Sequence, residues 1–207
     1  MLGRSRKLRI NYRTTHEILR WSLALLGEGD YDDLDEGTEN HDIAGYHSFI
    51  HGSDPITIGF ASKAAMIDGV VSQVRQWIDD GVDETEIAVT ARTKTSFSGV
   101  EQALRASGIM PFRLERDLKL ANGVALGTMH RLKGLEYRCV AVIDAADGDL
   151  PLPYAVTSET EDATQHAVDL RRERCLLYVA CTRAREDLWV GWSGTPSRFL
   201  RPVLDLD

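Results

Sequence analysis

Short apolar runs alternate with amphipathic stretches over most of this chain, and this alternation restricts the fold more than any other feature. The runs predict strands at Ile56–Ala61, Ile87–Arg92, Met110–Leu114, Gly123–Thr128, Arg138–Ala145 and Leu188–Trp192. The stretches between them predict helices at Ala64–Asp80, Phe97–Ser107 and Asp169–Ala184. Strands that alternate with helices are typical of an α/β fold, in which a mostly parallel sheet carries helices on both faces.

The N-terminal quarter of the chain has a different pattern. Residues 15–26 predict one more helix, with apolar residues on one side and Thr14 or Thr15 as its cap. Residues 27–55 are polar and rich in Asp, Glu and Gly. A structureless loop of this length is unusual inside a domain, so we expect a mobile loop or a short element around Tyr46–Ile50.

Composition narrows the class of protein. A length of 207 residues suits one domain, and 43% hydrophobic with 27% charged residues is enough to bury a core. No apolar run reaches the ~18 residues of a membrane span, and the basic N-terminus lacks the apolar region of a secretory signal. The three cysteines lack C-x-x-C spacing, which favours reduced thiols and a cytoplasmic protein. A net charge of −8 argues against strong nucleic-acid binding by this chain alone.

Three segments carry recognisable motifs, and they occur at Asn11–Thr15, Gly127–Tyr137 and Glu173–Ala184. They resemble motifs IV, V and VI of the UvrD/Rep-type helicases of superfamily 1, and they stand in the family's order. The resemblance extends from about Ile10 to about Val203. It implies a RecA-like domain that contributes half of an ATP site and half of a single-stranded DNA track to an ATP-dependent DNA helicase or translocase.

The resemblance assigns four residues to the ATP site. Tyr12 would stack on the adenine base, and Arg13 would reach the γ-phosphate with a planar guanidinium suited to phosphate oxygens. Glu136 would accept a hydrogen bond from a ribose hydroxyl. Arg183 would act as the arginine finger that neutralises charge on the γ-phosphate in the transition state. Arg183 and Arg13 are therefore the expected catalytic residues.

Three further residues are assigned to nucleic-acid binding. Thr128 and His130 can each donate a hydrogen bond to a phosphate of single-stranded DNA. Lys133 belongs to the same set and forms a tight turn with Gly134. Arg131 and Leu132 replace the small residues that are usual in the family, which affects the fine geometry of the DNA contact.

Half of the motor is absent from this sequence. No G-x-x-x-x-G-K-[ST] phosphate loop occurs, and the acidic string Asp83–Glu86 follows a turn, where we expect a loop and not a metal site. We therefore expect the whole chain, 1–207, to be the second RecA-like domain, with a first RecA-like domain as its partner. That domain would hold most of the Mg²⁺ that accompanies ATP. The isolated chain is expected to be inactive.

The accessory helical domain of the family should also be missing, since only residues 115–122 remain at its insertion point. Two other readings stay open. The chain could be a non-catalytic, helicase-like binding module that docks a partner protein or nucleic acid, or part of a translocase that acts on a protein–nucleic-acid assembly. Metal binding by His41, His47 and His51 and a nuclease cluster of Asp144, Asp147 and Asp149 are disfavoured, because the spacing is wrong for the histidines and the aspartates fall in a turn typical of the family.

Overall fold

A six-stranded parallel sheet forms the centre of the domain, with strands in the order β3-β8-β7-β4-β6-β5. The computed structural model describes residues 10–11, 13–27, 47–114 and 122–204. Within them the strands of this sheet are β3 (Ile56–Phe60), β4 (Ile87–Ala91), β5 (Pro111–Arg113), β6 (Val124–Thr128), β7 (Tyr137–Val142) and β8 (Ala184–Ser193). All five residues of β4 are buried, as a central parallel strand covered on both faces requires.

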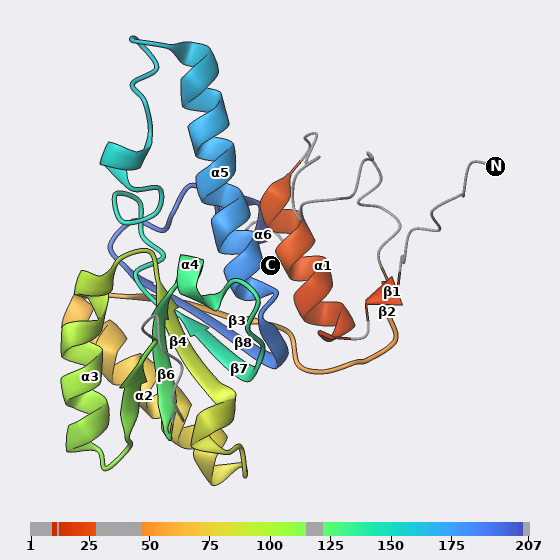
Figure 1. Ribbon diagram of the computed structural model, residues 1–207, viewed down its shortest axis with the longest axis vertical. Coiled ribbons are helices and arrows are strands. Elements are labelled where there is room, and N and C mark those ends of the chain that lie inside the picture. Colours follow the sequence, from red (N-terminus) through yellow and green to blue (C-terminus); the bar gives the residue numbers. More distant parts are fainter. Residues whose placement is uncertain (1–9, 12, 28–46, 115–121, 205–207) are drawn as a thin grey trace.

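Helices cover both faces of the sheet (Figure 1). They are α1 (His16–Leu26), α2 (Lys63–Asp79), α3 (Phe97–Ala106), α4 (Met129–Leu132), α5 (Ala163–Cys181) and α6 (Arg201–Leu204). One apolar core lies between the sheet and α1, α4, α5 and α6, and a second lies between the sheet and α2 and α3. This arrangement confirms the predicted α/β fold. Within the described ranges, no helix is both long and apolar enough to cross a bilayer.

The N-terminal region adds a second, smaller sheet. Strand β1 (Ile10–Asn11) pairs in parallel with β2 (His47–Ser48), which confirms a short element near residues 46–50. Of the predicted loop at 27–55, residues 28–46 lie outside the described residues. Helix α1 begins where predicted, because the Thr15 hydroxyl accepts a hydrogen bond from Ile18 N at 3.4 Å and caps it. Segments far apart in the sequence are therefore held together near the start of the domain.

Predicted and observed bounds differ most at the last long helix and at the last strand. The last long helix was expected at Asp169–Ala184, but α5 starts at Ala163, where Asp162 accepts a hydrogen bond from Gln165 N at 2.9 Å and caps it. Its first turns project beyond the sheet (Figure 1), so they lack the apolar stripe on which the prediction depended. At its other end, α5 stops at Cys181, because Ala184 already belongs to β8.

Strand β8 was expected over Leu188–Trp192, but it runs from Ala184 to Ser193. It lies inside the sheet, between β7 and β3. The edge strands are β3 and β5. Helix α2 buries Met66 and Trp77, while Ile67 and Ile78 are only partly buried. The position of a strand in the sheet and the buried side of a helix depend on tertiary contacts, which a local sequence pattern does not record.

Candidate functional site

The first group of predicted site residues meets at the amino end of β7. Glu136 stands directly before this strand, and its Oε1 lies 3.0 Å from Nε of Arg13. The Arg13 side chain is 70% exposed and the Glu136 side chain 37%, so a ligand can reach both. The backbone N–H of Thr15 donates to the carbonyl of Arg185 at 3.1 Å, which ties the segment of Arg13 to the start of β8. Tyr12 lies outside the described residues.

Arg183 joins the same edge of the sheet from the turn between α5 and β8. It was expected on the helix, but α5 ends two residues earlier. Its Nε donates to the Val179 carbonyl at 3.1 Å, which fixes one side of the guanidinium to the last turn of α5. The carbonyl of Arg183 accepts from the N–H of Tyr137 at 3.0 Å. Since Tyr137 follows Glu136, this bond holds the turn of Arg183 beside the Arg13–Glu136 pair.

The second group of predicted residues begins at the opposite, carboxyl edge of the sheet. Thr128 ends β6 and precedes α4, and His130 is exposed on α4. Partial burial lowers the pKa of His130, the charge of Arg92 lowers it further, and the carboxylate of Glu173 partly opposes both effects. The lowered pKa favours the neutral imidazole, which can donate one N–H to an acceptor.

The motif V segment connects these two edges. After α4, Lys133 is exposed, and Gly134 adopts a φ of +84°, which glycine tolerates without steric cost. The N–H of Leu135 closes this turn on the carbonyl of Leu132 at 2.9 Å. The predicted tight turn is confirmed. One short segment therefore runs from Thr128, at the carboxyl edge, to Glu136, at the amino edge.

A buried ion pair that was not predicted from the sequence lies beside His130. Arg92, directly after β4, and Glu173, in the middle of α5, share three hydrogen bonds of 2.8 to 3.1 Å. Their side chains are 15% and 7% exposed. Glu173 also accepts from the N–H of Leu152 at 3.3 Å. The pair therefore connects the carboxyl edge of the sheet, α5 and the segment before α5.

A signal for this pair exists in the sequence, but it is incomplete. Glu173 shares a helical face with Leu177 and Ala180, and a carboxylate on a buried face needs a partner. Nothing local identifies Arg92 as that partner, because the two residues are 81 positions apart.

Two of the three aspartates after β7 form ion pairs with cationic side chains. Asp144 is 3% exposed and lies 2.8 Å from Nζ of Lys63, and Asp147 pairs with Arg198 at 2.8 and 3.0 Å. His51 contacts Glu17 at 2.9 Å, while His41 lies outside the described residues. No group of three or more potential metal ligands occurs in the described part of the chain.

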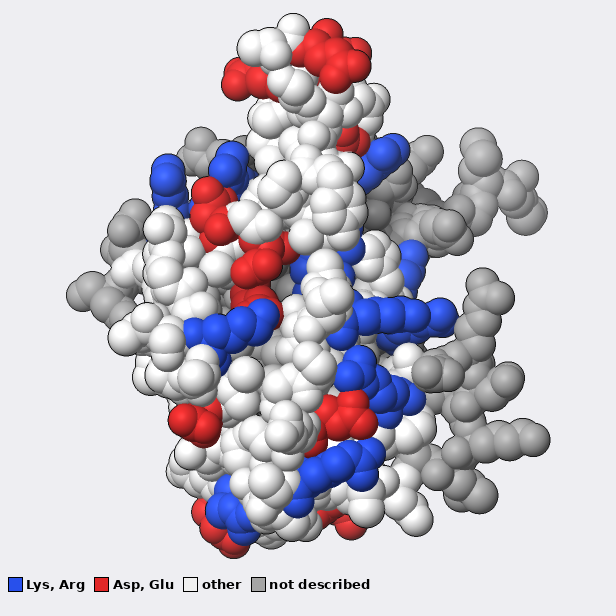
Figure 2. Space-filling view, turned by 90° about the vertical axis from the view of Figure 1, so that its left-hand side faces the viewer, with Lys and Arg blue, Asp and Glu red and all other residues white. Residues whose placement is uncertain are grey.

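Charges of both signs are interleaved on the face shown in Figure 2. Lys and Arg side chains occupy its middle together with Asp and Glu, and acidic side chains gather at the upper tip, where the segment before α5 and the start of α5 carry Glu159, Glu161 and Asp162. This face does not present a continuous basic stripe. Electrostatic attraction for a phosphate backbone would therefore be local.

Comparison with known proteins places these features in a family. The model of the UvrD-like helicase C-terminal domain matches residues 112–195, which include the segments resembling motifs V and VI. The chain is 35% identical over 154 residues to YjcD of Bacillus subtilis, named as a candidate ATP-dependent DNA helicase, and the match covers 71% of this chain and 19% of YjcD. It is 35% identical over 94 residues to the ATP-dependent DNA helicase UvrD2 of Mycobacterium tuberculosis, covering 41% of this chain and 13% of UvrD2.

A solved structure has the same fold. The C-terminal domain of a possible DNA helicase from Lactobacillus plantarum superposes with a TM-score of 0.64 at 21% identity, and the match covers 93% of this chain and 94% of that one. The architecture is thus that of a helicase C-terminal domain, an α/β domain with a mostly parallel sheet. This chain carries a UvrD-like helicase C-terminal domain. It spans about a fifth of the length of YjcD, and less of UvrD2.

Proposed function

We propose that this chain is the second RecA-like motor domain of an ATP-dependent, UvrD-like DNA helicase or translocase. The observation that carries the proposal is the convergence of three motif segments at one edge of the sheet. Arg13 contacts Glu136, and the residue after Glu136 is hydrogen-bonded to Arg183. These residues come from the N-terminus, the centre and the C-terminal third of the chain. Such convergence is expected of a ligand site and is not required by the core.

The proposed half-site fits a nucleotide. Arg13 and Arg183 offer guanidinium groups to phosphate oxygens, and the Glu136 carboxylate offers an acceptor to a ribose hydroxyl. Bound ATP would supply the phosphoanhydride whose hydrolysis drives opening and closure against the first domain. On nucleotide binding, Arg13 would exchange its contact with Glu136 for phosphate oxygens. The partial exposure of both side chains permits this exchange. Tyr12, outside the described residues, keeps its expected role of stacking on adenine.

The proposed DNA track begins at the carboxyl edge. Thr128, His130 and Lys133 would contact the backbone of single-stranded DNA, with hydroxyl, imidazole and ammonium donors. Because one short segment connects Thr128 to Glu136, a shift of that segment would change the contacts with both DNA and nucleotide. Domain movement during the ATP cycle requires such a difference in contacts between two states.

Steady-state ATP hydrolysis tests the proposal. The isolated chain should show no turnover, with or without single-stranded DNA, because it lacks a phosphate loop. Joined to its first motor domain, it should hydrolyse ATP, and DNA should stimulate the rate. Turnover near ~1 s⁻¹ by the isolated chain, which is low for an enzyme but well measurable, would contradict the single-domain assignment. A complete motor that neither binds nor hydrolyses ATP would favour the non-catalytic binding module.

A further inference from the structure

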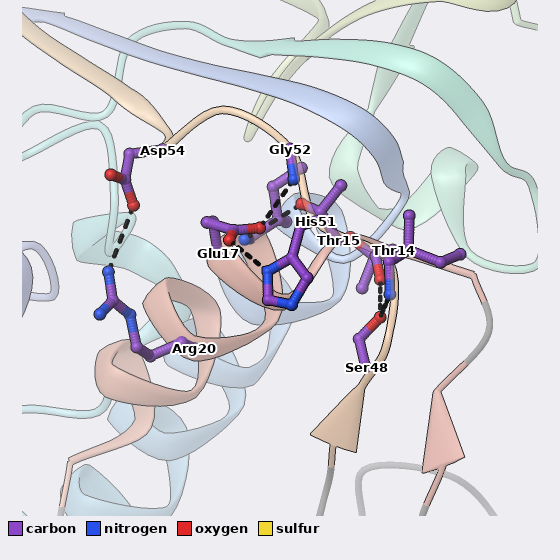
Figure 3. A network of polar contacts seen from close by, with 10 residues as sticks. Thr14, Thr15, Glu17, Arg20, Ser48, His51, Gly52 and Asp54 are labelled. Carbon is purple, nitrogen blue, oxygen red and sulfur yellow. Dashed lines mark hydrogen bonds and ion pairs between the residues drawn. The ribbon is translucent and has the colours of Figure 1, made fainter.

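Residues 48–54, which we call the strap, pass over the start of α1 and contact Thr14 and Glu17 (Figure 3). Ser48 is 5% exposed, and its hydroxyl donates to the Thr14 carbonyl at 2.7 Å and accepts from Ile50 N at 3.2 Å. The Ile50 carbonyl in turn accepts from the N–H of His16 at 2.7 Å. The strap thus satisfies backbone groups on either side of Thr15, the residue that caps α1.

A carboxylate of α1 fastens the middle of the strap. Glu17 accepts hydrogen bonds from Nδ1 of His51 and from the backbone N–H of Gly52, each at 2.9 Å. The bond from His51 lowers the pKa of Glu17 to about 2, although partial burial opposes the shift. A further ion pair, between Arg20 and Asp54 at 3.2 Å, is exposed at both ends and contributes little.

Gly52 is the point of closest approach. A Cβ at this position would lie 2.6 Å from Cγ2 of Thr15 and 3.4 Å from the carbonyl of Glu186. The reason for glycine here is space, since its backbone does not adopt a positive φ. Thr15 is therefore enclosed between the strap and the start of β8, where its N–H is bonded to the Arg185 carbonyl.

We propose that the strap is a positioning element of the nucleotide half-site, and that Gly52 and Ser48 act through Thr14 and Thr15 to place Arg13. The inference rests on the proposed function. The Arg13 guanidinium is exposed, so its reach is set by the backbone that follows it. That backbone is held between the strap and the start of β8. A misplacement of ~1 Å at a catalytic group can cost roughly 10²-fold in rate, which makes such a clamp functionally significant.

The test uses the 207-residue chain with the substitutions Gly52→Ala and Ser48→Ala. The matched control is Gly69→Ala, whose new Cβ would meet the Phe60 ring at 2.4 Å, between α2 and β3 and away from Arg13. One readout is the Nε–Hε signal of Arg13 in ¹H–¹⁵N spectra, assigned through its loss in Arg13→Lys. A second is the affinity for a fluorescent ATP analogue, and a third is the thermal midpoint.

Gly52→Ala and Ser48→Ala should move the Arg13 signal and speed its hydrogen exchange, with a loss of analogue affinity of about tenfold, or ~1.4 kcal/mol. Gly69→Ala should lower the thermal midpoint and leave the Arg13 signal and the affinity unchanged. The positioning role is refuted if the strap variants only lose stability, as the control does, with the Arg13 signal unmoved. If the unsubstituted chain binds no ATP analogue, the proposed nucleotide half-site is contradicted. The Arg13 signal still decides whether the strap positions that residue.

Discussion

Arg92 and Glu173 form a bidentate ion pair that ties the carboxyl end of β4 to the middle of α5. Helix α5 leads at its C-terminal end into the turn of Arg183. The pair therefore lies at the proposed DNA-binding edge, where both of its charges affect the pKa of His130, and α5 connects it to the proposed nucleotide edge. An ion pair in this place can serve stability and alignment together.

We predict that Glu173→Gln will destabilise the fold by about 3 kcal/mol, because it leaves the guanidinium of Arg92 desolvated without a counter-charge. Chemical denaturation of the purified chain measures this. The control is Arg20→Ala, which removes an ion pair whose side chains are 69% and 74% exposed. It should change the free energy of unfolding by less than ~0.5 kcal/mol. Equal changes in the free energy of unfolding would show that the buried pair stabilises the fold no more than the exposed pair does.

Stability should fall in acid partly through Glu17. Its pKa is lowered from 4.5 to about 2 in the folded state, chiefly by the hydrogen bond from His51. A lowered pKa means that the ionised carboxylate stabilises the fold above pH 4.5 and that this contribution disappears as the pH falls toward 2. Thermal midpoints measured between those values should therefore decline less steeply for Glu17→Gln than for the unsubstituted chain. Parallel curves would contradict this role of the carboxylate.

In the complete motor, Arg183→Ala should lower kcat by about 10²-fold or more, with a smaller effect on ATP binding, because the contact matters most as charge develops. Arg183→Lys should also lower kcat substantially, because lysine keeps the charge but lacks the planar guanidinium. Arg185→Ala is the control, because its side chain is 47% exposed and only its backbone carbonyl holds Thr15. Near-normal ATP hydrolysis by Arg183→Ala, or a large loss of ATP hydrolysis in Arg185→Ala, would show that Arg183 is not the arginine finger.

The isolated chain should bind single-stranded DNA weakly, no tighter than roughly 10⁻⁶–10⁻⁴ M at physiological salt, as non-specific binding does. His130→Ala should weaken this binding by up to about tenfold, the loss of one neutral hydrogen bond. It should not change the dependence on salt, because a neutral imidazole displaces no counterion. Lys133→Ala should instead reduce the salt slope by about one. Fluorescence anisotropy across a salt series separates the two, and nanomolar, salt-insensitive binding would contradict the proposed track.

Much of the architecture can be read from local sequence alone. The apolar runs that became β4 and β6, the cap at Thr15 and the turn at Gly134 depend on neighbours a few residues away, and each was predicted near its observed place. The candidate site could be assigned only because Arg13, Glu136 and Arg183 stand in motifs with fixed spacing. Their assigned roles remain predictions, since their contacts within the domain do not identify a ligand.

The sequence by itself determined the element types and the motif order, because period, capping and turn chemistry act over short distances. Only the tertiary structure decided that β8 lies between β3 and β7, that Arg92 meets Glu173, and that Gly52 encloses Thr15 against Glu186. These outcomes depend on how a sheet orders its strands and on which side chains then fill the remaining space. Arg92 and Glu173, for example, are 81 positions apart, and no local pattern records which of them meets the other.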